Sequence, residues 1–397
     1  MNINPKMLGL GKKSSIIREI FEYSKRRKGE IGADNVFDFS IGNPSVPAPD
    51  SINETMLRLL KEGDPVQLHG YTAGPGDPVV RQKLAAGINR EFDADANWQL
   101  MYMTCGAAAS LTISLAAITA SSDDEVIAFA PFFPEYRVFV EHAGAKLVTV
   151  PCREEDFQLD FDALEKAINP NTKALIINSP NNPTGVIIPA KDIERLAELL
   201  NQKQDEYGHV IYLIADEPYR KLVWNGEEVP YIPNYYGNSI VCYSFSKAVS
   251  LPGERIGYIL VSSKMKDAGD VYAAVCGAGR ALGFVCAPSL LQFTVAECAD
   301  DTSDFSIYRT NRDLLLRELT RIGYEVIQPD GAFYLFMKAL EPDANAFYEQ
   351  GKKHELLLVP SDSFGCPGYV RIAYCVTTEQ IERAIPAFEK LYEDYQK

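Results

Sequence analysis

The sequence predicts an α/β fold, with a mainly parallel central sheet flanked by helices. Two observations carry this prediction. Between about residues 99 and 260, short apolar stretches alternate with stretches of helical spacing, a pattern typical of parallel strands joined by helical crossovers. The composition is that of a globular protein, with 46% hydrophobic and 23% charged residues, which excludes wholesale disorder.

Each element of this region is predicted from its own residue pattern. Strands are expected where residues are almost continuously apolar, at 99–104, 125–130, 145–150, 174–178, 210–215, 240–244 and 256–261. Helices are expected at 107–120, 135–142, 160–168 and 192–206. In the last of these, the apolar residues at 193, 196, 199 and 200 share one helix face.

The two ends of the chain predict a second, smaller α+β domain. The N-terminal end holds an expected helix at 16–27 and a strand at 37–41. The C-terminal end adds expected strands at 324–327 and 333–337, a helix near 344–353, two further strands and a helix at 378–395. We therefore expect a large domain at 51–290 and a small domain formed by 1–50 and 291–397, with an N-terminal arm.

Charge and residue counts exclude several classes of function. The 39 basic and 54 acidic residues give a net charge of −15, which argues against nucleic acid or an anionic membrane as a partner. No apolar run approaches the ~20 residues that cross a bilayer. The eight cysteines form no C-x-x-C pair and the four histidines are isolated, so no metal site is predicted. Cysteines within apolar runs indicate small buried side chains in a reducing cytoplasm.

Polar residues follow several of the expected strands at their carboxyl ends, where open α/β sheets bind ligands. These residues are Gly106 after 99–104, Asn182 after 174–178, Asp216 and Tyr219 after 210–215, and Lys247 after 240–244. Because the carboxyl ends of parallel strands meet at one edge of a sheet, we expect a binding site there.

Lys247 and Asp216 are the most informative of these residues. An amine at the end of an apolar strand is partly desolvated, which lowers its pKa and keeps part of it neutral and nucleophilic. A carboxylate that ends a buried strand needs a cation or a full set of hydrogen bonds. Taken alone, a lysine in this position is more often a surface lysine that extends from a strand end into solvent.

A phosphate site is indicated beside them. The expected helix after Gly106 offers free backbone N–H groups, and Arg255 lies eight residues past Lys247. Alone, the small residues at this helix start also fit close packing, and Arg255 also fits a surface salt bridge. Pyridoxal 5′-phosphate (PLP) is a cofactor that uses a lysine, a carboxylate and a phosphate site together, so the sequence favours PLP.

The strand-end residues described above lie in short segments that follow one another along the chain. In the sequence and order of such segments, the chain resembles the class I/II aminotransferases, the aspartate-aminotransferase-like group of PLP-dependent enzymes with fold type I. The resemblance covers nearly the whole chain through DFSIGNP at 38–44, GYTAGPG at 70–76, TCGA at 104–107, PFFP at 131–134, NSPNNPTG at 178–185, DEPY at 216–219, SFSK at 244–247 with Arg255, GAFY at 331–334 and YVR at 369–371. It implies an aminotransferase that moves an amino group between an L-amino acid and a 2-oxo acid by a ping-pong mechanism.

The resemblance also implies a role for each matching residue. Lys247 is implied to form the Schiff base with PLP and to shuttle the proton, and Asp216 to pair with the pyridinium nitrogen. Tyr219 is implied to be the third catalytic residue, as a donor to the phenolic oxygen of the ring. The implied cofactor contacts are Asn182 and Tyr219 at the phenolic oxygen, Phe133 on the ring face, and Gly106, Ala107, Ala108, Ser244, Ser246 and Arg255 at the phosphate. Ala108 lacks a hydroxyl and Phe133 donates no hydrogen bond, and both depart from the family pattern.

The remaining implied roles concern the substrate and the subunit partner. Arg371 is implied to bind the substrate α-carboxylate, helped by Asn182 and the backbone of Gly42, and the Asn182–Pro183 bond is implied to be cis. Tyr71 is implied to reach the phosphate of a neighbouring subunit, which implies a homodimer with shared active sites.

Two other functions use the same residues. A PLP-dependent carbon–sulfur β-lyase differs only in the group that leaves the substrate β-carbon. A PLP-binding regulator without turnover would carry a DNA-binding domain, for which the chain has no basic segment. The substrate stays open, because Arg280, the one candidate for binding a second carboxylate, also fits a surface arginine.

Overall fold

The computed structural model describes residues 3–12 and 15–397. The chain divides into two compact units. The larger unit comprises Val46–Phe305 and Asp330–Ala332, and the smaller comprises the chain up to Ser45, Ser306–Pro329 and Phe333–Lys397. The expected α/β fold class is confirmed. The expected boundaries between the large and the small domain, near residues 50 and 290, remain a prediction; the two compact units meet along the chain at residues 45/46 and 305/306.

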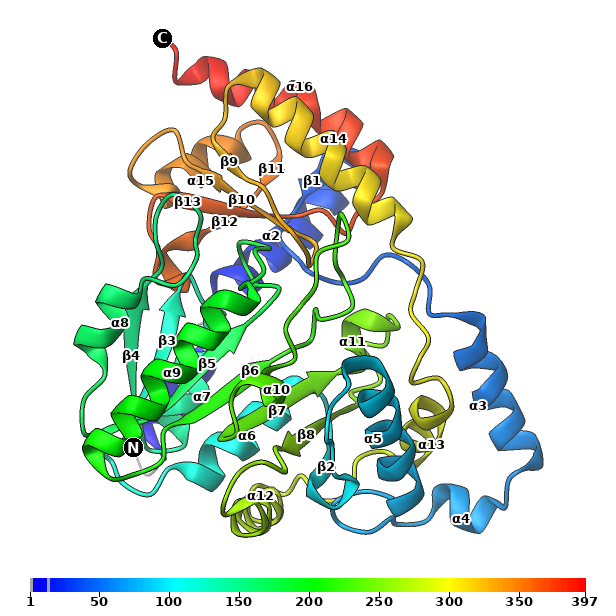
Figure 1. Ribbon diagram of the computed structural model, residues 1–397. Helices are drawn as coiled ribbons and strands as arrows, with labels where there is room; N and C mark the ends of the chain where they lie inside the picture. The colour runs from blue at the N-terminus through cyan, green and yellow to red at the C-terminus, as the bar shows by residue number, and fades with distance from the viewer. Residues whose placement is uncertain (1–2, 13–14) are drawn as a thin grey trace. The chain divides into compact units, whose positions relative to one another are not determined.

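A seven-stranded sheet forms the centre of the larger unit (Figure 1), in the order β2-β8-β7-β6-β5-β3-β4. Its strands are β2 (Met101–Thr104), β3 (Glu125–Ala130), β4 (Lys146–Pro151), β5 (Thr172–Asn178), β6 (Tyr212–Asp216), β7 (Ser239–Ser244) and β8 (Gly257–Val261). Neighbouring strands pair in parallel except for β8, which is antiparallel to both β2 and β7. The carboxyl ends of the other strands therefore lie along one edge.

Helices cover both faces of this sheet. The helices of the larger unit are α3 (Asp50–Glu62), α4 (Pro65–His69), α5 (Pro78–Phe92), α6 (Ala107–Ile118), α7 (Glu135–His142), α8 (Phe161–Ala167), α9 (Ala190–Tyr207), α10 (Ile232–Tyr235), α11 (Phe245–Ala248), α12 (Ala268–Leu282) and α13 (Ser289–Glu297), of which α3 and α4 pack against α13. Successive strand residues point to opposite faces. Thus Ile214 packs in one core with residues of α6, α7 and α12, while Leu213 and Ala215 pack in another with residues of α8 and α9.

The smaller unit contains two further sheets. An antiparallel sheet has the order β12-β13-β10-β9, and a parallel pair joins β1 to β11. The elements are α1 (Pro5–Lys12), α2 (Ile16–Ile31), β1 (Phe37–Asp38), α14 (Ser306–Ile322), β9 (Val326–Ile327), β10 (Tyr334–Lys338), α15 (Ala344–Lys352), β11 (Leu356–Leu357), β12 (Val359–Pro360), β13 (Tyr369–Ala373) and α16 (Thr378–Asp394).

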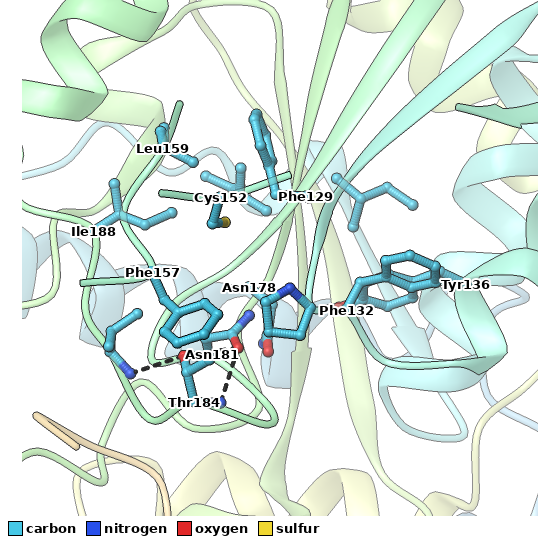
Figure 2. Close-up of a pocket in the computed structure, with 14 residues that line it drawn as sticks. Phe129, Phe132, Tyr136, Cys152, Phe157, Leu159, Asn178, Asn181, Thr184 and Ile188 are labelled. Atoms are coloured by element: carbon cyan, nitrogen blue, oxygen red, sulfur yellow. Dashed lines mark hydrogen bonds between the residues drawn. The ribbon is translucent and has the colours of Figure 1, made fainter. Parts of the chain in front are cut away.

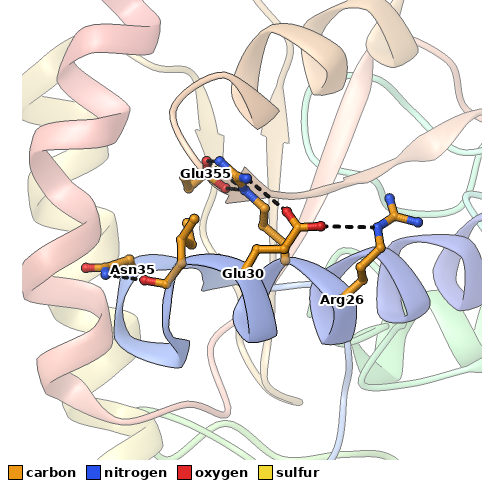
Figure 3. Close-up of polar contacts among 6 residues, drawn as sticks. Arg26, Glu30, Asn35 and Glu355 are labelled. Carbon is orange, nitrogen blue, oxygen red and sulfur yellow. Dashed lines mark hydrogen bonds and ion pairs between the residues drawn. The ribbon is translucent and has the colours of Figure 1, made fainter.

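Charged side chains fix α2 within the smaller unit (Figure 3). Arg27 donates to both carboxylate oxygens of Glu355, which directly precedes β11, and also to Glu30 on its own helix. Glu30 is in addition 3.9 Å from Arg26. The contact with Glu355 joins segments from opposite ends of the sequence.

Among the described residues, we find no helix with the length and apolarity needed to span a membrane.

Candidate active site

Asp216 is the last residue of β6 and is 5% exposed. Its Oδ2 accepts a hydrogen bond of 2.5 Å from the hydroxyl of Tyr136. Its Oδ1 is buried and has no hydrogen-bond partner within the described chain. Burial raises the pKa of Asp216 to about 7, against the opposing effect of the Tyr136 hydrogen bond, and the charge of Glu217 adds to the increase. The site therefore holds a buried acid with one oxygen open to a donor.

Tyr136 lies in the first turn of α7, one turn after Phe133. The two rings meet edge to face at 5.8 Å, and the Tyr136 ring stacks on Phe132 at 6.4 Å. Tyr136 and Asn178 also line a mainly apolar pocket with Phe129 and other residues (Figure 2). Burial, followed by the negative charge of Asp216, holds the pKa of Tyr136 well above its usual value, so Tyr136 stays a donor.

Asn178 joins the two chain segments that follow β5 and β6. Its Nδ2 donates to the backbone oxygen of Asp216 at 2.8 Å, and its Oδ1 accepts from the backbone N–H of Asn182 at 2.7 Å. The Asn182–Pro183 peptide bond is cis, as the resemblance implied. Asn182 and Tyr219 are both buried, at 5% and 6% exposed. One asparagine thus ties the segment that carries Asn182 to the backbone of the buried acid.

Arg255 and two serines lie near the start of α6. Gly106 precedes the helix with a φ of +89°, and a Cβ there would lie 2.9 Å from a guanidinium nitrogen of Arg255. The positive φ favours glycine at this position, and the absence of a side chain lets the Arg255 guanidinium lie close to the backbone. Nη1 of Arg255 is 3.4 Å from the hydroxyl of Ser246, which is 2.7 Å from the hydroxyl of Ser244.

The same helix end shows features expected of a phosphate site. The described first turn of α6 has no acidic residue and no side-chain cap, so the N–H groups of Ala107 and Ala108 remain free of side-chain acceptors. Arg255 itself has a φ of +54°, a conformation that non-glycine residues seldom adopt and that is often found at functional sites.

Lys247 lies in the single turn α11, directly after β7, and is half-buried between Ser246 and Ala248. The register of the sheet relates it to the other residues. Asp216 pairs with Cys242 on β7, and two residues further on, Ser244 pairs with Gly257, which also pairs with Thr104. Asp216 and the starts of the segments that carry Lys247 and Gly106 therefore all lie at the same edge of the sheet.

A buried ion pair spans the turn that follows β6. Glu217 and Arg220 bind each other three residues apart, and both are nearly inaccessible. The Arg220 guanidinium also donates to the Tyr258 hydroxyl at 3.0 Å and lies 4.7 Å from the ring centres of Phe92 and Tyr243. This pair closes the turn that presents Tyr219.

Arg371 and Gly42 belong to the smaller unit and lie close to the same tyrosine. Arg371, on β13, is 2% exposed, donates to the backbone oxygen of Ser40 at 2.5 Å and lies 4.5 Å from the ring centre of Tyr334. A Cβ at Gly42 would collide with the Tyr334 hydroxyl. Asp38 in turn accepts from the N–H and hydroxyl of Ser40 at 3.0 and 2.6 Å. These contacts hold the guanidinium in place.

Two of the residues singled out in the sequence lie on the surface of the larger unit. Tyr71 is 99% exposed, and Arg280 is exposed in the last turn of α12. Sequence reasoning missed Tyr136, Asn178 and the Glu217–Arg220 pair. Asn178 ends a buried strand, the same signal that marked Asp216, and so could have been found.

Comparisons with known proteins identify the family. Residues 34–388 match the family model of aminotransferase class I and II. A probable aspartate/prephenate aminotransferase from Thermus aquaticus is 31% identical over 367 residues, covering 91% of this chain and 92% of that protein. The aromatic-amino-acid aminotransferase 2 of Thermococcus litoralis is 29% identical, with 96% of each chain covered.

Solved structures agree with this result. An aminotransferase from Eubacterium rectale is 53% identical and superimposes with a TM-score of 0.98 over 100% of both chains. The aspartate aminotransferase of Thermus thermophilus, solved with maleate, is 26% identical, with a TM-score of 0.85 over 98% of this chain and 100% of that one. The fold is therefore that of the fold-type-I enzymes, and the chain belongs to the class I and II aminotransferases. It is a PLP-dependent transaminase, which confirms the expected activity and cofactor.

The residues present fit PLP. The open, buried Oδ1 of Asp216 suits a ring N–H donor. The start of α6, which has no side-chain cap and lies beside the Arg255 guanidinium, suits a phosphate group. No group of three or more acidic, histidine or cysteine side chains suited to a metal occurs among the described residues.

The raised pKa of Asp216 predicts a pH-dependent stability of the protein freed of PLP. Since the pKa is about 7 in the folded state and 3.8 is the ordinary value, the folded protein binds more protons between these pH values. The free energy of unfolding should therefore fall as pH rises through this window, by about 4 kcal/mol in all. In urea unfolding, Asp216→Asn should gain stability over the wild type from pH 5 to pH 8.

The exposed Asp205 on α9 provides the control for this experiment. Asp205→Asn should follow the wild-type pH profile. A constant difference in stability between Asp216→Asn and the wild type across this pH range would contradict the assignment of the buried charge.

Proposed function

We propose that Lys247, Asp216 and Tyr219 carry the transamination catalysed by this chain. The observation that supports this most strongly is the buried Oδ1 of Asp216, which lacks a partner in the described structure and ends a strand next to the one that leads to Lys247. A buried carboxylate without a cation is unfavourable, and a ring N–H⁺ would relieve it.

In this proposal the larger unit holds the cofactor at both ends. Asp216 keeps the proton on the ring nitrogen, and Asn182 and Tyr219 donate to the phenolic oxygen. Gly106, Ala107, Ala108, Ser244, Ser246 and Arg255 bind the phosphate, while Phe133 covers one face of the ring. When bound, PLP supplies an aldehyde that accepts an amine and a ring that takes up electrons from the substrate α-carbon.

Lys247 moves the proton. Its amine is half-buried directly after β7, and with PLP bound it would be the base that takes the proton from the substrate α-carbon and later gives it back. Water would release the first substrate as a 2-oxo acid, the amino group would stay with the cofactor held by these residues, and a second 2-oxo acid would take it up as the steps run in reverse. The donor and the acceptor therefore react one after the other.

Arg371 is proposed to bind the substrate α-carboxylate, with help from Gly42 and Asn182. Its guanidinium is held by Ser40 and Tyr334, and an arginine fixed in this way can bind a carboxylate through two parallel hydrogen bonds. The names of the relatives, aspartate, aspartate/prephenate and aromatic-amino-acid aminotransferase, support aspartate as the first donor to test and an aromatic amino acid as the second. Arg280 is the candidate for a side-chain carboxylate.

A homodimer is proposed for the assembled enzyme. Tyr71 is almost fully exposed, and the larger unit also exposes Leu57, Val66 and Val285 at 67%, 79% and 45%. Val285 lies next to the loop that carries Tyr71, since Cys286 donates its N–H to the backbone oxygen of Gly74. Exposed apolar side chains on the unit that carries Tyr71, a tyrosine that the family uses across subunits, support a second copy as the partner.

The cytoplasmic location and the division into a large cofactor-binding and a small domain remain proposals. All eight cysteines lie in the described chain and none forms a disulfide, which supports a reducing compartment. Cys242, Cys298 and Cys375 are buried, and the other five are partly exposed.

A panel of amino donors with 2-oxoglutarate, oxaloacetate and pyruvate as acceptors tests the proposed function. We expect aspartate to form oxaloacetate only when an acceptor is present in turnover amounts, with parallel initial-rate lines because donor and acceptor react in turn. Pyruvate and ammonia released from cystathionine without an added oxo acid would instead indicate the β-lyase, which no comparison favours.

A further inference from the structure

Tyr136 is a buried residue that has no part in the scheme above. It is 2% exposed, and its hydroxyl makes the side-chain hydrogen bond to Oδ2 of Asp216. The two residues are 80 positions apart in sequence, so the sheet and α7 bring them together. The Tyr136 hydroxyl therefore binds Oδ2 of Asp216, whereas Oδ1 is the oxygen proposed to accept from the cofactor.

The position of the Tyr136 hydroxyl is set by packing. The ring stacks on Phe132 with an interplanar angle of 12° and meets the edge of Phe133 at 86°. Tyr136 also belongs to the core cluster that includes Val140 and residues of α6. A ring held on several sides offers its hydroxyl to one fixed point, and Asp216 must orient itself to that point.

The hydrogen bond has two physical consequences. A donor on Oδ2 fixes the orientation of the carboxyl group about its last torsion, so Oδ1 is the oxygen left for another donor. A hydrogen bond to the charged form also favours ionisation, which opposes the effect of burial at this site. Both consequences favour a carboxylate ready to accept from a ring N–H⁺.

We propose that Tyr136 is a positioning residue that holds Asp216 through Oδ2, so that an ionised Oδ1 faces the ring nitrogen of PLP. The proposal rests on the role proposed for Asp216. Tyr136 does not itself contact a reacting atom.

Tyr136→Phe tests this, because it removes only the hydroxyl and keeps the ring. The probe is 4′-deoxypyridoxine 5′-phosphate, which has the ring nitrogen and the phosphate but no aldehyde, so that its binding is independent of Lys247. By titration on the protein freed of PLP, we expect Tyr136→Phe to raise the Kd at pH 7 about 10–100-fold, the range for a hydrogen bond to a charged group.

The pH profile of the Kd separates positioning from a general structural effect. Without the Tyr136 hydrogen bond, the pKa of Asp216 should rise further, so the loss of affinity at low pH should begin at a higher pH than in the wild type. Tyr236→Phe is the matched control, because Tyr236 is 1% exposed and donates to the backbone oxygen of Ile211 at 2.6 Å. It should leave both the Kd and its pH profile unchanged.

Asp216→Asn distinguishes the failure of this inference from that of the proposed function. If Asp216→Asn weakens the probe and Tyr136→Phe does not, the positioning role is wrong and the role of Asp216 stands. If neither variant changes the Kd, the role of Asp216 itself is wrong. Combined with Asp216→Asn, Tyr136→Phe should add little, and full additivity of the two effects would overturn the coupling proposed here.

Discussion

Replacing Lys247 with alanine should reduce the turnover of any amino donor by at least about 10²–10⁴-fold, the contribution of a positioned proton-transfer group. The reason is that Lys247 is a half-buried amine in the turn α11, which follows β7 at the edge of the sheet where Asp216 ends β6. Binding of 4′-deoxypyridoxine 5′-phosphate should persist, since Asp216 and the proposed phosphate site are untouched. Single-turnover kinetics with aspartate and a binding titration measure the two effects separately.

Lys266 provides the control for this variant. It is an exposed lysine shortly after β8, so Lys266→Ala should retain the wild-type turnover. Turnover by Lys247→Ala within a few-fold of the wild type would show that another group moves the proton.

Replacing Arg220 with alanine should lower the free energy of unfolding by about 3–5 kcal/mol, the effect of removing one partner of a buried ion pair. Glu217 would remain buried next to Asp216 without its counter-charge, and the space between Phe92 and Tyr243 would lose its guanidinium. Urea unfolding of the holoenzyme, followed by circular dichroism, measures this change.

Two further variants make this test specific. Arg26→Ala removes an exposed pair with Glu30 (Figure 3), whose side chains are 68% and 50% exposed, and should lower stability by less than about 1 kcal/mol. Glu217→Gln combined with Arg220→Met should recover part of the loss, because no buried charge is left unpaired. A loss below about 1 kcal/mol for Arg220→Ala would contradict the buried pair.

The central sheet could be predicted because its pattern is local. The strand expected at 174–178 is found at Thr172–Asn178, and the helix expected at 107–120 is found at Ala107–Ile118. The strand expected at 37–41 is shorter, Phe37–Asp38, because its partner β11 offers only two residues to pair with it. Helices α3 to α5 were not predicted, although Asp77 followed by Pro78 is a typical helix start that caps α5.

The residues of the candidate site were predictable where strand ends present them, as with Asp216 and Lys247. The contact with Tyr136 was not, because it depends on strand order, with β5 placed between β3 and β6. The i, i+3 spacing of Glu217 and Arg220 is visible in the sequence. Their burial is not, since the rings of Phe92, Tyr243 and Tyr258 reach them from three other elements.

The central claim is that Lys247 is the lysine to which the cofactor binds. Borohydride treatment of the holoenzyme fixes PLP permanently to the lysine that holds it, and peptide mass mapping then identifies that lysine. We predict that the cofactor mass is found on the peptide containing Ser244-Phe-Ser-Lys247, and that it is absent from this position in Lys247→Ala. Attachment to a different lysine in the wild-type protein would contradict the account.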